Sequence, residues 1–250
     1  MPHAVARLRA KRLAISKKPF QARGALLVRC PRCRVAQEYC ICAWQPQVAA
    51  RSAVCLLMYD AEPLKPSNTG WLIADVVADT FAFGWARTEV EPALLDLLAD
   101  PQWQPYVVFP QEYAQPNQHV VHELQQDTMQ THGQDAAPKR PLFIVLDGTW
   151  HEARKMFRKS EYLHHFPILS LRPEQVSRYH LRHSVNLEHL STAEVMVLCL
   201  HLAEEVQAAE ALAEWFVRFN RHYLAARTPL SKQQAQRLMG ETLPDNNTLT

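Results

Sequence analysis

Residues 141–150 have the sequence Pro-Leu-Phe-Ile-Val-Leu-Asp-Gly-Thr-Trp, and they contain the clearest buried strand in the chain. An uninterrupted apolar run of this length is typical of a strand that is covered on both faces. Asp147 ends the run, Gly148 permits a sharp turn, and a helix is expected to begin at Trp150 and to continue through Phe157. A strand that passes directly into a helix is the unit from which parallel sheets are built, so this segment predicts an α/β fold.

The same alternation of strand and helix extends in both directions from this segment. Strands are expected at residues 53–59, 81–85, 106–109 and 166–171, and helices at residues 71–77, 92–98, 192–207 and 210–224. Residues 115–140 lack hydrophobic periodicity and are expected to form a long surface loop. We therefore expect a basic N-terminal segment at residues 1–48, one α/β domain with a mostly parallel sheet at 49–227, and a flexible tail at 228–250.

The net charge of +2 hides an uneven distribution of charge along the chain. Residues 1–34 contain ten Lys or Arg residues and no Asp or Glu, whereas the remainder has 17 basic and 25 acidic residues. Clustered cations release counterions when they bind phosphates, which makes nucleic acid the expected partner; a solvated N-terminal segment is the alternative. The candidate nucleic-acid contacts in this segment are Arg7, Arg9, Lys11, Arg12, Arg32 and Arg34.

Four of the six cysteines lie close together in the sequence, at Cys30, Cys33, Cys40 and Cys42, and the other two lie in apolar runs. Both thiolates of the first pair can face one tetrahedral ion, and the second pair could close the site from the other side. Four thiolates leave no open position for water, so such a zinc ion would be structural. A disulfide framework is the alternative, and the absence of a secretory signal disfavours it.

The motifs that the sequence lacks exclude several large classes of protein. No apolar run approaches the ~20 residues that cross a bilayer, and the N-terminus has no signal-like apolar stretch, so we expect a soluble cytoplasmic protein without a membrane partner. The six glycines form neither a dinucleotide-binding fingerprint nor a P-loop. A serine-hydrolase elbow and a zinc-protease helix motif are also missing, so a small-molecule site would have to be built from loops.

Three segments at the ends of expected elements could build such a site, because ligand sites in parallel sheets form at the carboxyl ends of strands. Residues 67–70 (SNTG) precede a helix and could bind an anion through amides and hydroxyls. Residues 147–150 offer Asp147 as a base and Trp150 as an aromatic face. Residues 191–194 (STAE) form a capping box. An ordinary loop, a strand-to-helix cap and a structural N-cap are the respective alternatives.

The order and spacing of these segments resemble the DTW-domain family. The resemblance rests on residues 62–70 (EPLKPSNTG), 146–156 (LDGTWHEARKM), Leu181-Arg182 and 191–194 (STAE), and it spans roughly residues 5–225. Residues 146–156 and the cysteine-rich N-terminus are similar to the bacterial branch of the family, the tRNA-uridine aminocarboxypropyltransferases.

This resemblance implies a SPOUT-like α/β fold with a C-terminal trefoil knot, in which S-adenosylmethionine binds in the knot loops. It also implies transfer of the 3-amino-3-carboxypropyl group to N3 of a uridine in the tRNA variable loop, with methylthioadenosine as the by-product. Residues 49–227 would then be the catalytic domain. The expected cofactor contacts are Ser67, Thr69, Gly70, Pro110, Gly148, Thr149, Trp150, Ser191 and Thr192.

The implied reaction requires a base, because uridine N3 becomes a good nucleophile only after its proton leaves. Asp147 is the candidate base, in a desolvated setting that would raise its pKa. Trp150 could stack on adenine or uracil, or contact the sulfonium. Lys65, Arg87 and Arg154 are candidates for holding the cofactor carboxylate or an RNA phosphate. A SPOUT-type RNA methyltransferase and a non-catalytic zinc-knuckle RNA-binding protein are the two alternative functions.

Overall fold

A six-stranded sheet forms the centre of the computed structural model, which describes residues 1–17, 20, 27–124, 138–172, 174–175, 190–226, 233–234 and 237. The strands are β1 (Ala53–Met58), β2 (Thr80–Gly84), β3 (Trp103–Val108), β4 (Val120–Val121), β5 (Arg140–Asp147) and β6 (Ile168–Leu169). Their order in the sheet is β2-β1-β5-β3-β6-β4, and every neighbouring pair is parallel. The expected α/β fold with a mostly parallel sheet is confirmed.

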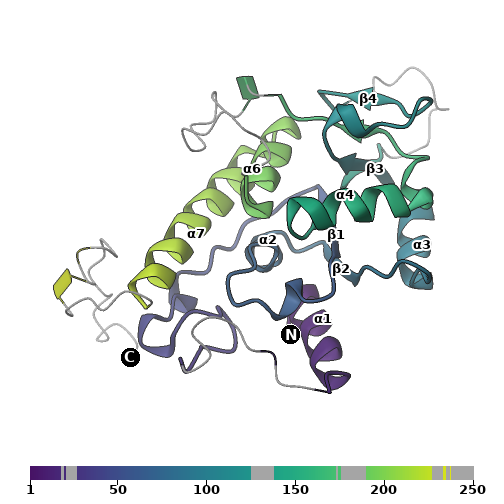
Figure 1. The fold of residues 1–250 in the computed structure, drawn as a ribbon. Coiled ribbons are helices and arrows are strands. Elements are labelled where there is room, and N and C mark those ends of the chain that lie inside the picture. Colours follow the sequence, from purple (N-terminus) through teal and green to yellow (C-terminus); the bar gives the residue numbers. More distant parts are fainter. Residues whose placement is uncertain are drawn as a thin grey trace.

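Helices cover both faces of this sheet (Figure 1). On one face lie α2 (Gly70–Val76), α6 (Thr192–Leu202) and α7 (Val206–Ala225), and on the other lie α3 (Pro92–Ala99) and α4 (Trp150–Lys159). Side chains of β5 alternate between the two cores: Phe143 and Val145 pack with the first group of helices, Leu142 and Ile144 with the second. Burial on both faces is the physical reason for the unbroken apolar run at residues 141–146.

Strand β5 lies between two strands that precede it in the sequence. It pairs with β1 up to Met58 opposite Asp147, and with β3 up to Val108 opposite Val145. The chain segments that leave β1 and β3 therefore flank the end of β5. Short 3-10 helices occur in these segments, η3 (Glu62–Leu64) after β1 and η4 (Gln111–Tyr113) after β3, and a third, η5 (Glu161–Leu163), follows α4.

Two expected helix boundaries are wrong, because the break between α6 and α7 falls at residues 203–205 and not after residue 207. Glu204 adopts a left-handed conformation with φ 58°, which ends α6. The Glu205 carboxylate accepts hydrogen bonds from the amides of Arg51 and Ser52, both at 2.8 Å. A contact with the start of β1 therefore fixes the position of the break.

The third and fourth strands also differ from the expected pattern. β3 begins at Trp103, three residues earlier than expected, and it includes Pro105. The Val107 amide points toward β6, and residue 105 faces the same side because residues two apart in a strand point the same way. Proline has no amide hydrogen, but β6 begins beyond this point, so no strand hydrogen bond is lost at Pro105. Strand β4 lies within residues 115–140, which we expected to be a loop throughout, and it pairs with β6.

The N-terminal segment is folded against the α/β domain and does not form only a solvated tail. Helix α1 (Ala4–Ala14) is capped by His3, and it contacts β2, η3 and α2. The cysteine-rich segment contains η1 (Gln37–Tyr39) and η2 (Cys42–Trp44). Val5, Cys33 and Ile41 belong to the same core as side chains of the sheet. The division at residue 48 stays a prediction.

Several expectations concern residues outside the described part of the chain: Leu181, Arg182, residues 125–137 of the expected loop and nearly all of the tail at 228–250. The SPOUT-like assignment and the trefoil knot stay predictions. None of the helices in the described ranges has both the length and the apolar character needed to cross a membrane.

We expect Val5→Ala to lower the free energy of unfolding by about 1–3 kcal/mol, because Val5 lies on the face of α1 that packs on the core and its side chain is completely buried. Leu13→Ala on the same helix is the matched control; Leu13 is exposed, and its loss should change stability by no more than about 0.5 kcal/mol. Urea unfolding of both variants measures the difference. Equal, small effects would show that α1 does not dock in solution.

Candidate functional site

The carboxylate of Asp147, at the end of the central strand β5, joins three segments of the chain. Asp147 is only 3% exposed. Its Oδ2 accepts a hydrogen bond from Asn68 Nδ2 at 2.8 Å, and its Oδ1 accepts one from Thr192 Oγ1 at 2.6 Å. Asn68 belongs to the loop after β1, and Thr192 is the first residue of α6. Segments that are far apart in the sequence therefore meet at one carboxyl group.

Asn68 connects this carboxylate to a second one. Its Nδ2 also lies 3.3 Å from Glu62 Oε2, and Lys65 pairs with the other carboxylate oxygen of Glu62. The Asn68 side-chain oxygen accepts a hydrogen bond from the Trp71 amide at 3.0 Å, which supports the first turn of α2. Asn68 and Glu62 are thus buried beside Asp147, and half-buried Lys65 extends this network toward the surface.

Gly70 is required by the close approach of this loop to Asp147. A Cβ atom at position 70 would lie 2.7 Å from Asp147 Oδ2 and 3.2 Å from the Asn68 side-chain oxygen. The first distance is one that real Cβ atoms essentially never show, and the second is tighter than an ordinary van der Waals contact, so a side chain at position 70 would push Asp147 Oδ2 away from its place beside Asn68. The glycine therefore lets α2 begin directly against the strand end.

Burial is the main reason that the pKa of Asp147 is raised, from 3.8 to about 6. The charge of Glu62 raises this pKa further, whereas the hydrogen bonds from Asn68 and Thr192 and the charge of Lys65 lower it. A carboxyl group with this pKa can exchange a proton near neutral pH, which is a property of general acids and bases.

The starts of α4 and α6 have the same local structure. Thr149 and Ser191 are the N-caps, and each exchanges hydrogen bonds with the glutamate three residues later, Glu152 or Glu194. Both capping boxes are complete, so the hydroxyl groups of Thr149 and Ser191 are occupied within their own helices. The Thr69 hydroxyl accepts a hydrogen bond from the Ala193 amide at 3.3 Å and thereby ties the β1 loop to α6.

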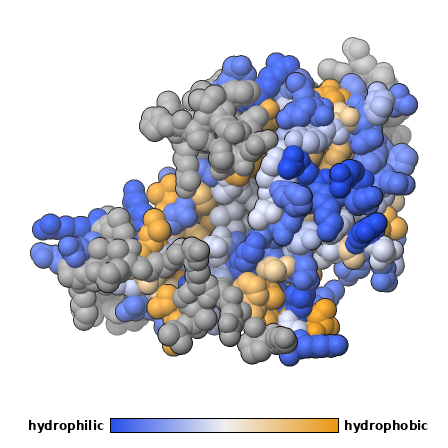
Figure 2. Space-filling view, viewed as in Figure 1, coloured by the Kyte–Doolittle hydropathy of each residue, from blue (hydrophilic) through white to orange (hydrophobic). Residues whose placement is uncertain are grey.

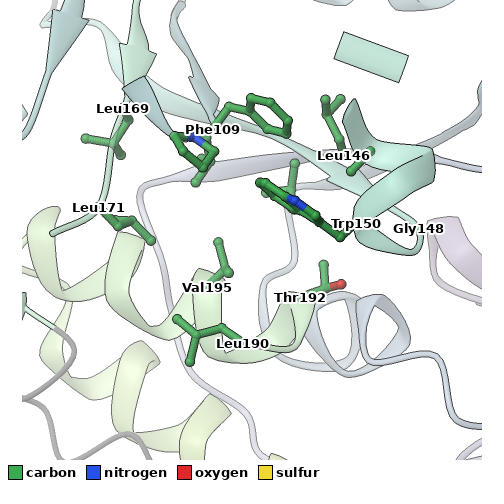
Figure 3. Close-up of a pocket in the computed structure, with 13 residues that line it drawn as sticks. Phe109, Leu146, Gly148, Trp150, Leu169, Leu171, Leu190, Thr192 and Val195 are labelled. Carbon is green, nitrogen blue, oxygen red and sulfur yellow. The ribbon is translucent and has the colours of Figure 1, made fainter. Parts of the chain in front are cut away.

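A cavity of about 130 Å³ opens beside this network, between the ends of β3, β5 and β6 and the start of α6 (Figure 3). Four of the predicted cofactor contacts line it: Pro110, Gly148, Trp150 and Thr192. Most of the remaining lining is apolar, from Val108, Phe109, Val145, Leu146, Ala153, Leu169, Leu171, Leu190 and Val195. Thr192 both lines the cavity and donates to Asp147, so the carboxyl group lies directly behind the cavity wall.

Aromatic rings form one side of the cavity. Trp150 stacks on Phe109, with ring centroids 5.4 Å apart, and meets the Tyr113 ring edge-on at 5.7 Å. The Arg154 guanidinium lies over the Trp150 ring, 6.0 Å from its centroid. These contacts hold the Trp150 ring in place where it lines the cavity.

The structure separates the predicted site residues into those at the cavity and those elsewhere. Ser67 and Arg87 are exposed, and neither lines the cavity. Lys65 is half-buried and pairs with Glu62. The sequence reasoning missed Asn68 and Glu62 as parts of the site. The available signal was the position of these two polar side chains between an expected strand and an expected helix, in a segment on which the family resemblance already rests.

The four clustered cysteines converge as predicted. Their Sγ atoms all lie within 4.8 Å of one another; Cys30 and Cys42 are 3.6 Å apart, Cys33 and Cys40 3.8 Å. Four sulfurs bound to zinc at about 2.3 Å in tetrahedral geometry are about 3.8 Å apart. All four thiols are free and far from disulfide distance, so this donor set fits a zinc ion. The two isolated cysteines, Cys55 and Cys199, are buried in the core as expected.

The six predicted nucleic-acid contacts in the N-terminal segment fall into two groups. Four of them are engaged by nearby acceptors: Arg12 by Asp60, Lys11 by Glu91, Arg7 by the Pro2 carbonyl and Arg32 by Gln45. The others, Arg9 and Arg34, lie together with Arg29. Burial, followed by the charges of Arg9 and Arg29, lowers the pKa of Arg34 to about 10. The thiols of Cys33 and Cys30 act in the opposite direction.

The sequence matches the DTW domain model over residues 27–224. This range includes the cysteine cluster, all six strands and the Asp147 network. The chain therefore belongs to the DTW-domain family, which is associated with tRNA-modifying enzymes and indicates an RNA partner. No solved structure matches the chain.

The cysteine cluster predicts that the purified protein holds about one zinc ion per chain. Cys33→Ser should remove most of it, because the substitution deletes one of four ligands. Cys199→Ala, which removes a buried thiol outside the cluster, should leave the zinc content unchanged. Elemental mass spectrometry of the three proteins measures this, and a zinc-free wild type would rule out the zinc site.

The raised pKa of Asp147 predicts a specific pH dependence of stability. Between pH 3.8 and about 6 the folded state binds the Asp147 proton more tightly than the unfolded state. This contribution to the free energy of unfolding is full below pH 3.8 and is lost as the pH rises through about 6. Asp147→Asn cannot titrate, so the stability of the wild type relative to this variant should fall across that window. Urea unfolding at a series of pH values measures both curves, and parallel curves would contradict the raised pKa.

Proposed function

We propose that this protein transfers the 3-amino-3-carboxypropyl group of S-adenosylmethionine to N3 of a uridine in the tRNA variable loop and releases methylthioadenosine. The observation that carries the proposal is the position of Asp147 in a DTW-domain protein. This buried carboxyl group, whose pKa is raised to about 6, adjoins an apolar, aromatic-sided cavity at the carboxyl edge of a parallel sheet. Ligand sites of open α/β sheets occur at this edge.

The cavity suits the adenine end of the donor. Its lining is mainly aliphatic and aromatic, which favours a flat, weakly polar ring over a charged group. Pockets that enclose a whole ligand of this kind have volumes of about 300–1,000 Å³, so a cavity of about 130 Å³ would hold one end of the donor. Trp150 offers a ring face for stacking or for contact with the sulfonium. The aminocarboxypropyl arm would then extend toward the loops around Asp147.

Asp147 would take the proton from uridine N3. N3 then forms a bond to the γ-carbon of the methionine moiety, the bond between that carbon and sulfur breaks, and its electron pair stays on sulfur as neutral methylthioadenosine. A carboxylate has about four acceptor positions, and Asn68 and Thr192 occupy two of them. One carboxylate can therefore keep both loops in place and still accept a further N–H.

The surface of α4 would face the RNA beside the cavity. Arg154, Arg158 and Lys159 are exposed on this helix, and Figure 2 shows strongly hydrophilic side chains over α4. Since Arg154 lies over the Trp150 ring, an RNA phosphate bound by Arg154 would be next to the cavity.

Incubation of the full chain with S-adenosylmethionine and an unmodified tRNA transcript tests the proposal. Mass analysis of the nucleosides and of the donor remnant should give aminocarboxypropyl-uridine and methylthioadenosine. A methylated nucleoside with S-adenosylhomocysteine would show that the protein is a methyltransferase. Tight tRNA binding without any product and without donor binding in calorimetry would show a non-catalytic RNA-binding protein.

Asp147→Asn and Asp147→Ala should each reduce the rate of transfer by about 10²–10⁴-fold, because a general base contributes that much. Asparagine has nearly the same shape as aspartate but cannot accept the proton, so donor binding by Asp147→Asn should stay close to that of the wild type. Single-turnover assays and calorimetry measure the two quantities. A loss of donor binding as large as the loss of transfer in both variants would assign Asp147 a structural role only.

A further inference from the structure

Three arginines lie together beside the cysteine cluster. Arg9 comes from α1, and Arg29 and Arg34 flank the first cysteine pair. Arg29 Nη1 donates a hydrogen bond to the Arg34 carbonyl at 3.2 Å, and the charges of Arg9 and Arg29 both act on Arg34. Arg34 is 9% exposed, whereas Arg9 and Arg29 are half-buried, so the group is open to solvent on one side. We call these residues the arginine triad.

No carboxylate neutralises the arginine triad within the described ranges. The ion pairs found there use the carboxylates of Asp75, Glu91, Asp60, Glu62 and Asp79, and their partners are other residues. One buried nitrogen of each triad member has no hydrogen-bond partner: Arg9 Nε, Arg29 Nη2 and Arg34 Nε. Buried donors without acceptors are unfavourable, and three on neighbouring cations point to a binding site for an anion.

Aromatic rings hold two members of the triad in place without neutralising their charge. The Arg34 guanidinium lies over the Trp71 ring, 5.7 Å from its centroid, and the Arg29 guanidinium lies over the Tyr223 ring at 5.3 Å. Stacking on a ring face leaves the N–H groups at the edge of the guanidinium plane available for a ligand. The site is therefore arranged before the anion binds.

The backbone of Arg34 gives a second, independent observation. Its φ is 66°, a left-handed conformation that glycine adopts without steric cost and arginine does not. The turn at residues 30–34 requires only the backbone amide of Arg34, which donates to the Cys30 carbonyl at 3.0 Å; it does not require the arginine side chain. An arginine kept at a position that favours glycine indicates that its side chain has a role.

We propose that the arginine triad binds a phosphate group of the RNA backbone. This inference rests on the proposed function, since it assumes an RNA substrate, and it names the residues that fix the RNA on the protein. A phosphate offers several acceptor oxygens to converging guanidinium groups, which suits a site built from arginines. Trp71 connects the site to the candidate active site: its ring contacts Arg34, and its amide donates to Asn68, which binds Asp147.

The test compares two triad variants with the wild type in tRNA binding, measured by fluorescence anisotropy at several salt concentrations. Arg34→Gly and Arg29→Gln should each weaken binding of an unmodified tRNA transcript roughly tenfold. Each should also make the dependence of log K on log salt shallower by about one, because one phosphate contact is lost. Arg34→Gly should keep its zinc and should not lower Tm, since it relieves the left-handed backbone at position 34.

Arg221→Gln is the matched control, because Arg221 is an exposed arginine on α7 close in sequence to Tyr223 and outside the triad. Arg221→Gln should weaken tRNA binding clearly less than the triad variants do. An equal effect would show that RNA binds to positive charge spread over the surface, and it would overturn the triad as a specific site. Loss of zinc together with tRNA affinity in Arg34→Gly would show that the triad balances the thiolate charge, which also overturns it. If the wild type transfers the group to tRNA but both triad variants keep its affinity and salt dependence, the phosphate site is overturned and the proposed function stands. A wild type that binds no tRNA would overturn the proposed function and the site together.

Discussion

The two hydrogen bonds to the Asp147 carboxylate are the interaction on which the candidate site depends. They connect the end of β5 with the loop after β1 through Asn68 and with the start of α6 through Thr192. A carboxylate in an almost fully buried position is unfavourable unless it accepts such bonds, and the donors are unfavourable without an acceptor. The three segments are therefore stable together and unfavourable apart. Gly70 permits the approach, because any larger residue would displace the carboxylate.

The same burial that makes this carboxylate costly also makes it chemically useful. Removal of water raises the pKa of Asp147 to about 6, and the neighbouring charge of Glu62 acts in the same direction. The two hydrogen bonds oppose this rise and keep the pKa from going higher. The balance between desolvation and hydrogen bonding at Asp147 therefore determines both its pKa and the position of the segments that bind it.

The N-terminal segment is coupled to this site through α2. Trp71 is the second residue of this helix; its indole Nε1 donates to the Arg32 carbonyl at 2.8 Å, and its ring contacts Arg34 and His3. These arginines flank Cys33 in the cysteine cluster, and α1 adds Arg9. Residues that we propose to bind RNA are therefore packed against the helix whose first turn is fixed by Asn68.

Local features of this protein were determined by the sequence itself. The apolar runs at residues 53–59 and 141–146 predict buried strands, the capping box at residues 191–194 predicts the start of a helix, and the cysteine spacing predicts that four sulfurs meet. These interactions join residues close in the chain, so pattern and spacing suffice to recognise them. The tertiary structure alone decided the strand order, which places β5 between β1 and β3 and brings Asn68 to Asp147 across 79 residues. It also decided which leucines and valines line the cavity and which arginines lack a carboxylate partner. Both depend on how whole elements pack, and an apolar side chain at a cavity wall has the same sequence signal as one in the core.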